Sequence, residues 1–128
     1  QKNFTFTYIG RTSDSLPNST IIKPLHGKNL GEELSKYDIY VSGSRFDPGP
    51  NHIIESLACQ IPTLVHKDGG GAVEFSGKDS SFETAQDLIR LINKIATGDQ
   101  IQNSMKPKSW SDCMEKVYNV IQDSLKNE

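Results

Sequence analysis

This chain of 128 residues has few of the residue types that mark specialised classes of protein. It has only two cysteines, Cys59 and Cys113, which lie too far apart in sequence to form a metal-type pair. Charge is nearly balanced, with 14 Lys and Arg against 16 Asp and Glu, so we expect no nucleic-acid partner. No apolar run approaches the ~20 residues that span a bilayer. Because free thiols fit a reducing compartment, we expect a cytoplasmic location.

Several catalytic and cofactor-binding signatures are also missing from the sequence. It contains no Gly-x-Gly-x-x-Gly, which argues against dinucleotide binding. The stretch 69–79 resembles a phosphate loop, but Ala72 stands where Gly-x4-Gly-Lys needs its first glycine, and Asp79 stands where Ser or Thr would bind magnesium. No Asp-x-Asp pair, Cys/His cluster of ligand spacing or Gly-x-Ser-x-Gly elbow occurs. We therefore expect neither a metal site nor a separate cofactor.

Short strand signals alternate with helical periodicity along the chain. Residues 4–9, 20–23, 39–41 and 63–66 have strand character, and residues 29–37, 51–59, 84–97 and 112–125 have helical character. Such alternation predicts an α/β fold with a parallel sheet and helices on both faces. We expect residues 1–128 to form a single Rossmann-like domain of three layers.

Local signals mark the ends of the predicted helices. Thr84 followed by Asp87 predicts a capping box, and Gly98 predicts the end of that helix. Asn29 followed by Glu32 predicts an earlier helix start. The sequence 106–111 predicts a break. The last helix is expected to pack through one apolar face, with a packing anchor just before it; these residues are Met114, Val117, Tyr118, Ile121 and the anchor Trp110.

The stretch 42–74 is the most informative part of the chain. A polar loop containing Asp47, Gly49 and Pro50 follows a predicted strand, and a helix is expected to begin at Asn51. A helix that begins beyond the carboxyl end of a strand directs free N–H groups and a positive dipole end into a crevice. Pro50 suits the first helical turn, where a missing N–H costs nothing, and Gly49 permits close approach of a ligand. This layout predicts an anion site.

Polar side chains near this helix extend the prediction to a nucleotide sugar. Asn51 and Glu55 are four residues apart and His52 and Glu55 three apart, so all three share the polar side of the helix. Asp47 in the loop and Glu55 in the helix could hold hydroxyl groups. A site for phosphate and for several hydroxyls suits a nucleoside-diphosphate sugar.

Other candidate binding residues lie where the remaining predicted strands end. They are Gly10 and Arg11 after the first strand, Pro24 and Lys28 after the second, Ser44 after the third and the turn 67–71 after the fourth. Because ligands of such folds bind at the carboxyl ends of parallel strands, we expect these residues to line one site. A phosphate contact and an ordinary surface position explain Arg11 equally well, and for Lys28 a solvated loop is the stronger alternative.

Three motifs follow one another in the stretch 42–74. They are Asp47-x7-Glu55, then Ser56-Leu57-Ala58-Cys59-x-x-Pro62, then Gly69-Gly70-x-x-x-Glu74. Together they resemble the donor-site signature of GT-B glycosyltransferases of the retaining family 4 type. That family has Glu at the position of Asp47 and Gly at the position of Gln60. The resemblance extends from about Phe4 to about Ile121.

The resemblance implies a fold, an activity and a partner domain. The fold is the C-terminal half of a GT-B enzyme whose first strand–helix unit is missing here. The activity is metal-independent, retaining transfer of a hexose from a nucleoside-diphosphate sugar to a glycan, lipid or other acceptor. The partner is an N-terminal acceptor domain of the same enzyme, which the chain does not contain, so the chain alone is expected to be inactive. The full-length enzyme could associate peripherally with a membrane.

The resemblance also implies roles for individual residues. Glu55 would hold the ribose hydroxyls of the donor, and Asp47 would touch the transferred sugar. The backbone N–H groups near Asn51 and His52 would face the diphosphate.

Two other classes of protein remain open. A non-catalytic nucleotide-sugar or nucleotide-binding module could use the same fold, and a sugar-nucleotide epimerase shares the two-domain architecture. Asp47 and Glu55 together with Gly49 favour a transferase over an epimerase. The sequence does not separate a transferase from a silent binder, because the other half of the cleft is not present. Since the chain begins with Gln1 rather than Met, we expect it to be a fragment or a processed form of a longer protein.

Overall fold

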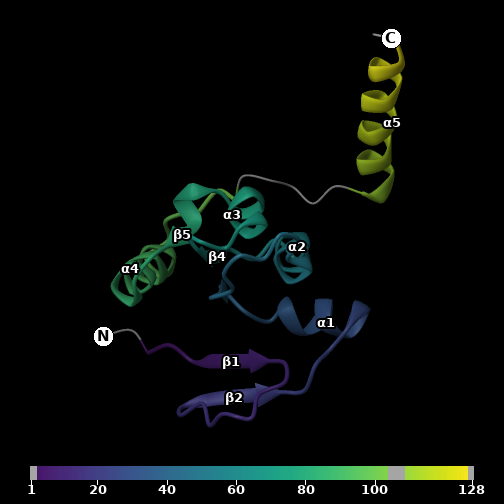
Figure 1. The fold of residues 1–128 in the computed structure, drawn as a ribbon. Helices are drawn as coiled ribbons and strands as arrows, with labels where there is room; N and C mark the ends of the chain where they lie inside the picture. Colours follow the sequence, from purple (N-terminus) through teal and green to yellow (C-terminus); the bar gives the residue numbers. More distant parts are fainter. Residues whose placement is uncertain (1–2, 104–108, 127–128) are drawn as a thin grey trace. The chain divides into compact units, whose positions relative to one another are not determined.

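The computed structural model describes residues 3–103 and 109–126 of a mixed α/β chain (Figure 1). Contacts group the chain into two compact units, residues 1–37 and residues 38–128. Each unit has its own small sheet, and the strands in both sheets are parallel. The predicted α/β class with parallel strands is confirmed, whereas the single domain over residues 1–128 stays a prediction.

The first unit holds strands β1 (Phe6–Ile9) and β2 (Ser19–Ile22), which pair in parallel from Phe6 opposite Ser19 to Ile9 opposite Ile22. Both strands lie within about two residues of the predicted ranges, because aromatic and β-branched residues favour the extended backbone. The Gly10 N–H donates to the Ile22 carbonyl at 3.0 Å and extends the ladder by one residue.

Helix α1 (Gly27–Leu34) follows in the same unit and differs from the prediction at both ends. His26 is its N-cap residue and makes no side-chain capping bond, so the start predicted at Asn29 is wrong. Asn29 lies inside the first turn, where its side chain is past the N-terminal N–H groups that a cap would satisfy. The helix ends at Leu34 rather than near residue 37, and the Ser35 hydroxyl donates to the Gly31 carbonyl at 2.8 Å.

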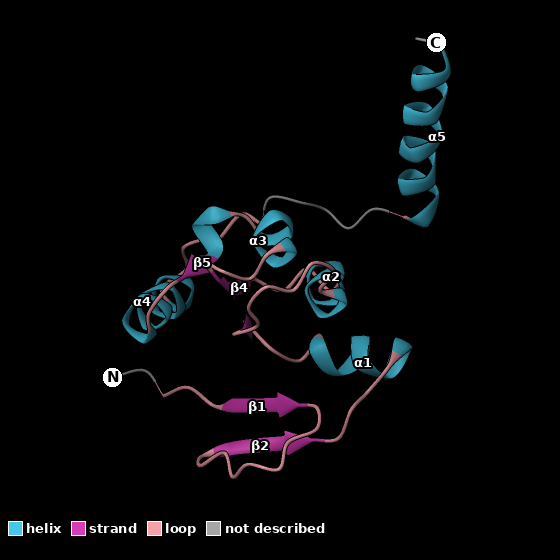
Figure 2. Cartoon of the chain, in the orientation of Figure 1, coloured by secondary structure: helices cyan, strands magenta, loops and turns pink. Residues whose placement is uncertain are grey.

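The second unit contains a three-stranded parallel sheet in the order β3-β4-β5, coloured magenta in Figure 2. Its strands are β3 (Tyr40–Ser42), β4 (Thr63–His66) and β5 (Ser81–Phe82). Every residue of β4 is buried, as is typical of a central strand in a parallel sheet. The fourth predicted strand is confirmed at 63–66, and β3 begins one residue later than predicted.

Helices of this unit pack against β4 through two separate clusters. The helices are α2 (Asn51–Ala58), α3 (Gly71–Ser76) and α4 (Ala85–Ala96), with a 3-10 turn at Lys78–Ser80. One cluster contains Ile53, Leu57, Val65 and Ala72, and the other contains Leu64, Phe82, Leu91 and Ile92. Successive residues of a strand point to opposite faces, so Leu64 and Val65 divide the core between the two clusters.

Both ends of α4 follow the sequence prediction. Thr84 and Asp87 form a reciprocal capping box, in which the Asp87 N–H donates to the Thr84 hydroxyl and the Thr84 N–H donates to the Asp87 carboxylate, both at 3.1 Å. At the other end Gly98 has φ of +99°. The N–H groups of Gly98 and Asp99 donate to the carbonyls of Ile95 and Lys94 at 3.0 and 3.1 Å, which is the Schellman arrangement.

An asparagine after α4 connects three segments of the second unit. The Asn103 side-chain amide donates to the carbonyls of Thr63 and Ser76 at 3.1 and 3.0 Å, and it lies 3.1 Å from the Ser80 hydroxyl. The Ser56 hydroxyl bonds the Thr63 hydroxyl at 2.9 Å inside the same region. The start of β4, the end of α3 and the 3-10 turn are therefore held together by one side chain.

Helix α5 (Trp110–Lys126) begins two residues before the predicted start. Ser109 and Asp112 cap it, with the Asp112 N–H 3.2 Å from the Ser109 hydroxyl. None of its described residues is buried and Trp110 is 80% exposed, and the predicted packing face and the predicted anchor at Trp110 stay predictions. Helical periodicity predicts an apolar stripe but does not supply a surface for it. Of the predicted break at 106–111, residues 106–108 lie outside the described residues.

Within residues 3–103 and 109–126, no helix has the length and apolar character needed to cross a membrane.

Candidate functional site

Two loops at the carboxyl end of the second sheet are joined through their backbones. The Phe46 N–H donates to the Asp68 carbonyl at 2.8 Å, and the Gly71 N–H donates to the Asp47 carbonyl at 3.0 Å. Asp47 and Gly70 form an isolated parallel bridge. The predicted convergence of the loop after β3 and the turn after β4 is therefore found in this unit.

Close backbone approach explains the glycines of the turn. Gly70 has φ of +66°, and a Cβ added there would lie 2.8 Å from the Asp47 carbonyl oxygen. A Cβ added at Gly71 would lie 2.8 Å from the Pro48 carbonyl oxygen. Neither position has room for a side chain, so the glycines are needed to hold the two loops together.

Helix α2 begins beside this join. Pro50 is its N-cap residue, one position before the first turn where the sequence placed it, and its carbonyl accepts from the N–H groups of Ile53 and Ile54 at 3.0 and 3.4 Å. The intrahelical ladder thus starts at Ile53. The N–H groups of Asn51 and His52 precede it, where helices carry N–H groups available to anions.

The side chain of His52 is fixed to the end of β3. Its Nε2 lies 3.0 Å from the Ser42 hydroxyl, and its ring lies 6.2 Å from the Tyr40 ring. The Ser44 N–H also approaches the Ser42 hydroxyl, at 3.3 Å. Ser42 therefore brings two predicted site residues, Ser44 and His52, to the same place.

The two predicted carboxylates have different surroundings. Asp47 is half-buried, and its Oδ1 accepts from the Gly49 N–H at 3.1 Å within the loop. Such a turn is a common local use of an aspartate side chain. Glu55 is exposed on α2, four residues after the exposed Asn51 and on the same face. Glu55 is thus directly accessible from solvent, whereas one oxygen of Asp47 is occupied by its own loop.

The remaining predicted residues belong to the first unit. Gly10 continues the β1–β2 ladder, and the carbonyl of Arg11 accepts from the Tyr8 hydroxyl at 3.1 Å. Pro24 is exposed, and Lys28 lies 3.6 Å from Glu32 in a surface ion pair. That these residues share a site with the loop 43–50 stays a prediction.

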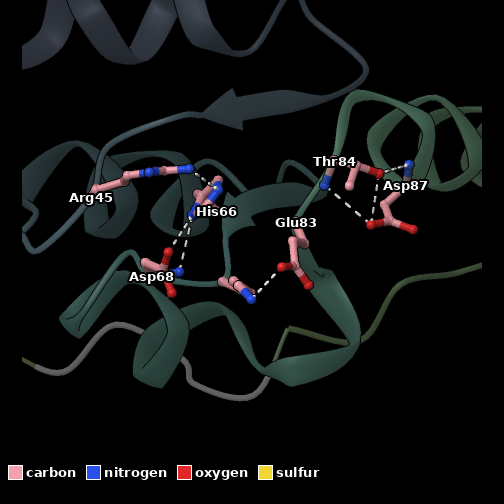
Figure 3. Close-up of polar contacts among 7 residues, drawn as sticks. Arg45, His66, Asp68, Glu83, Thr84 and Asp87 are labelled. Carbon is pink, nitrogen blue, oxygen red and sulfur yellow. Dashed lines mark hydrogen bonds and ion pairs between the residues drawn. The ribbon is translucent and has the colours of Figure 1, made fainter.

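One pair of residues at this edge was missed by the sequence analysis. Figure 3 shows Arg45 reaching across to His66, with Nη2 at 3.0 Å from Nε2. The other ring nitrogen, Nδ1, accepts from the Asp68 N–H at 3.0 Å, and the ring meets Phe82 edge-on at 5.7 Å. His66 is only 6% exposed. A histidine as the last residue of a buried strand, at the end where ligands bind, is the signal that could have identified it.

Hydrogen bonds at the surface shift the pKa values of two charged side chains. Lys67 donates to the Glu83 carboxylate, and this hydrogen bond raises the pKa of Lys67. The hydroxyl and the backbone N–H of Thr84 lower the pKa of Asp87. Lys67 is therefore already paired with a carboxylate next to the site.

In the part of the chain that the structure describes, no group of three or more His, Cys, Asp or Glu side chains is placed to hold a metal ion. The groups that are present are backbone N–H donors, carboxylates and a guanidinium, which suit anions and hydroxyl groups.

Comparisons with protein-family models, with curated proteins and with solved structures found no match to this chain.

Proposed function

We propose that this chain is the donor-binding part of a metal-independent retaining glycosyltransferase that transfers a hexose from a nucleoside-diphosphate sugar. The observation that carries the proposal is the backbone join between Asp47 and Gly70 beside the first turn of α2. This join sets a loop carboxylate, a glycine turn and the N-terminal end of a helix next to one another. Those are the groups that a diphosphate and a sugar require.

Each group has a role in the proposed site. The N–H groups of Asn51 and His52, with the positive end of the α2 dipole, receive the diphosphate. Glu55 accepts hydrogen bonds from the ribose hydroxyls, and Asp47 accepts one from the transferred sugar through the oxygen that Gly49 does not use. Hydrogen bonds to a charged group contribute about 1.5–3 kcal/mol each, so Glu55 alone has a measurable effect on affinity.

Two features of the fold support the GT-B assignment. Side chains of β4 pack into separate clusters on its two faces, as they do in a three-layer sheet with helices on both sides. Gln60, at the position where the resembled signature has glycine, has φ of +58°, a conformation that favours glycine. On this proposal the acceptor domain precedes the chain in a longer cytoplasmic enzyme, which could associate peripherally with a membrane.

A second candidate is a non-catalytic nucleotide-sugar-binding module on the same fold. The bond from the Gly49 N–H to Asp47 favours it, because a carboxylate used to hold its own loop has less capacity for a substrate. Both candidates bind the nucleotide through α2 and Glu55. They differ in whether Asp47 distinguishes a nucleotide sugar from the bare nucleotide.

Titration calorimetry of the 128-residue chain with UDP-, GDP- and ADP-sugars, with and without EDTA, tests the proposal. We expect weak binding of one nucleotide class that EDTA leaves unchanged. Loss of binding in EDTA would contradict the metal-free site, and absence of binding across the panel would contradict the donor site. Transfer to any acceptor by the chain alone would overturn the expectation that the acceptor domain is needed to position the substrates.

A further inference from the structure

The contact between Arg45 and His66 places two hydrogen-bond donors against a ring that can accept only one. A neutral imidazole has one N–H and one nitrogen lone pair, and a guanidinium has donors only. The Asp68 N–H points at Nδ1 and Arg45 Nη2 points at Nε2, each at 3.0 Å. One of these two contacts is therefore not a hydrogen bond in the neutral ring.

Of the two donors, the backbone N–H of Asp68 is the more firmly placed, so it is the one that bonds the nitrogen lone pair of the ring. Asp68 is two residues after His66, and the backbone is held on both sides of its N–H: the Lys67 N–H donates to the Phe82 carbonyl and the Phe46 N–H donates to the Asp68 carbonyl, both at 2.8 Å. Arg45 is an exposed, long side chain that can change rotamer. With the lone pair on Nδ1, Nε2 carries the proton and points at the guanidinium.

Two N–H donors that face each other call for an acceptor between them. Among the described residues no carboxylate forms an ion pair with Arg45, and the nearby Lys67 pairs with Glu83 instead. The carboxylate of Asp68 lies 3.7 Å from Nδ1 of His66, on the other side of the ring from Arg45. The acceptor that these two donors lack is thus not supplied by the neighbouring side chains.

We propose that Arg45 and the Nε2–H of His66 form an oxyanion site at the carboxyl end of β4. A phosphate or carboxylate oxygen accepts from both donors, and a small movement of the exposed Arg45 side chain opens the space for it. The guanidinium supplies charge and a second N–H for a bidentate contact, and the buried imidazole supplies a donor of fixed direction. This site is separate from the roles given to Asp47 and Glu55 and does not depend on a nucleotide sugar.

Nitrogen-detected NMR of the 15N-labelled full chain tests the proposal through the His66 tautomer. Spectra are recorded at about pH 8, above the range in which histidines ordinarily titrate, during titration with inorganic phosphate and separately with acetate. His66→Gln assigns the ring signals. We expect the Nε2–H tautomer in the free chain and a saturable shift of Nε2 with at least one anion. The ratio of the phosphate and acetate affinities identifies which oxyanion the site prefers.

Matched arginine variants separate this site from a general charge effect. Arg45→Gln should weaken the anion-dependent shift by roughly ten-fold, because one charged hydrogen-bond partner is lost. Arg90→Gln removes the same charge from exposed α4 and should leave it unchanged. Equal weakening by the two variants would overturn the proposal. So would the Nδ1–H tautomer in the free chain, because Nε2 would then accept from Arg45 and no donor would lack a partner.

Discussion

Asp47 and Gly70 pair in a parallel bridge that joins the loop after β3 to the turn after β4. The Gly71 N–H, which donates to the Asp47 carbonyl at 3.0 Å, secures the same contact. The backbone position of Asp47 therefore depends on the glycine turn. Because the carboxylate proposed to contact the donor sugar belongs to Asp47, a change in the turn should alter both folding and binding.

Gly70→Ala should destabilise the second unit. The new methyl group would lie 2.8 Å from the Asp47 carbonyl oxygen, and the backbone has φ of +66°, so strain and overlap act together. We expect a loss of about 1–3 kcal/mol in the free energy of unfolding, measured by urea denaturation. Gly43→Ala in the same loop is the control, because a Cβ there meets nothing within 4 Å. Equal losses in both variants would show that the bridge is not what holds the loops.

Asn103→Ala should also destabilise this unit, because the side-chain amide bonds the start of β4 and the end of α3. Leaving the Thr63 and Ser76 carbonyls without this donor should lower the free energy of unfolding by about 1–3 kcal/mol, measured by thermal or urea denaturation. Asn93→Ala, at an exposed position on α4, should be neutral or slightly stabilising because alanine favours helix. A neutral Asn103→Ala would mean that solvent replaces the amide without loss.

A reciprocal pair of substitutions tests the left-handed residues that end α2 and α4. Gln60 has φ of +58° and follows α2, and the N–H groups of Gln60 and Ile61 donate to the Leu57 and Ser56 carbonyls at 3.0 and 3.3 Å. Gly98 occupies the equivalent position after α4. Gln60→Gly should raise the free energy of unfolding by about 1 kcal/mol, and Gly98→Ala should lower it by about 1 kcal/mol. Changes of the same sign would contradict this explanation.

The capping box of α4 makes stability depend on acidic pH. Hydrogen bonds from the Thr84 hydroxyl and backbone N–H hold the pKa of Asp87 below its ordinary value of 3.8. Its contribution is present above pH 3.8 and is lost as the pH falls through the lowered pKa of the folded state. Asp87→Asn should reduce the loss of stability in this acidic range, measured by urea unfolding between neutral pH and about pH 2. An unchanged pH profile would show that Asp87 in the capping box does not cause the loss of stability at acidic pH.

Thr84→Ala should lower the free energy of unfolding by about 1 kcal/mol at neutral pH, because the first turn loses its side-chain acceptor. Thr84→Ser keeps a hydroxyl and should recover most of the loss. Differential scanning calorimetry of both variants checks this expectation. Equal melting temperatures for the alanine and serine variants would show that the hydroxyl does not cap α4.

Parts of the fold that depend on local sequence could be predicted. The buried run of β4 and the Thr84–Asp87 box are local patterns, and the structure has them where the sequence placed them. β5 has only two residues and exists through its pairing with Val65 and His66, which no local pattern reveals. Helix α3 begins inside the glycine turn, where glycine is a poor predictor of helix.

Part of the candidate site could likewise be predicted from the sequence, and part could not. The approach of the two loops follows from the rule that parallel strands end at one edge, and the bridge between Asp47 and Gly70 agrees with it. The bond from the Gly49 N–H to Asp47 and the contact between Arg45 and His66 depend on three-dimensional side-chain geometry. Spacing along the chain does not contain that information.

Calorimetric affinities of Glu55→Gln and Asp47→Asn for a nucleoside diphosphate and for its sugar conjugate test the proposed function most directly. Glu115→Gln on α5 is the control for charge, and melting temperatures control for folding. The proposed site predicts that Glu55→Gln weakens both ligands by roughly ten-fold, because the ribose contact is common to them. It predicts that Asp47→Asn weakens only the sugar conjugate. If Glu55→Gln lowers the melting temperature but leaves both affinities intact, or if Asp47→Asn weakens the bare nucleotide as much as the conjugate, the proposed donor site is wrong.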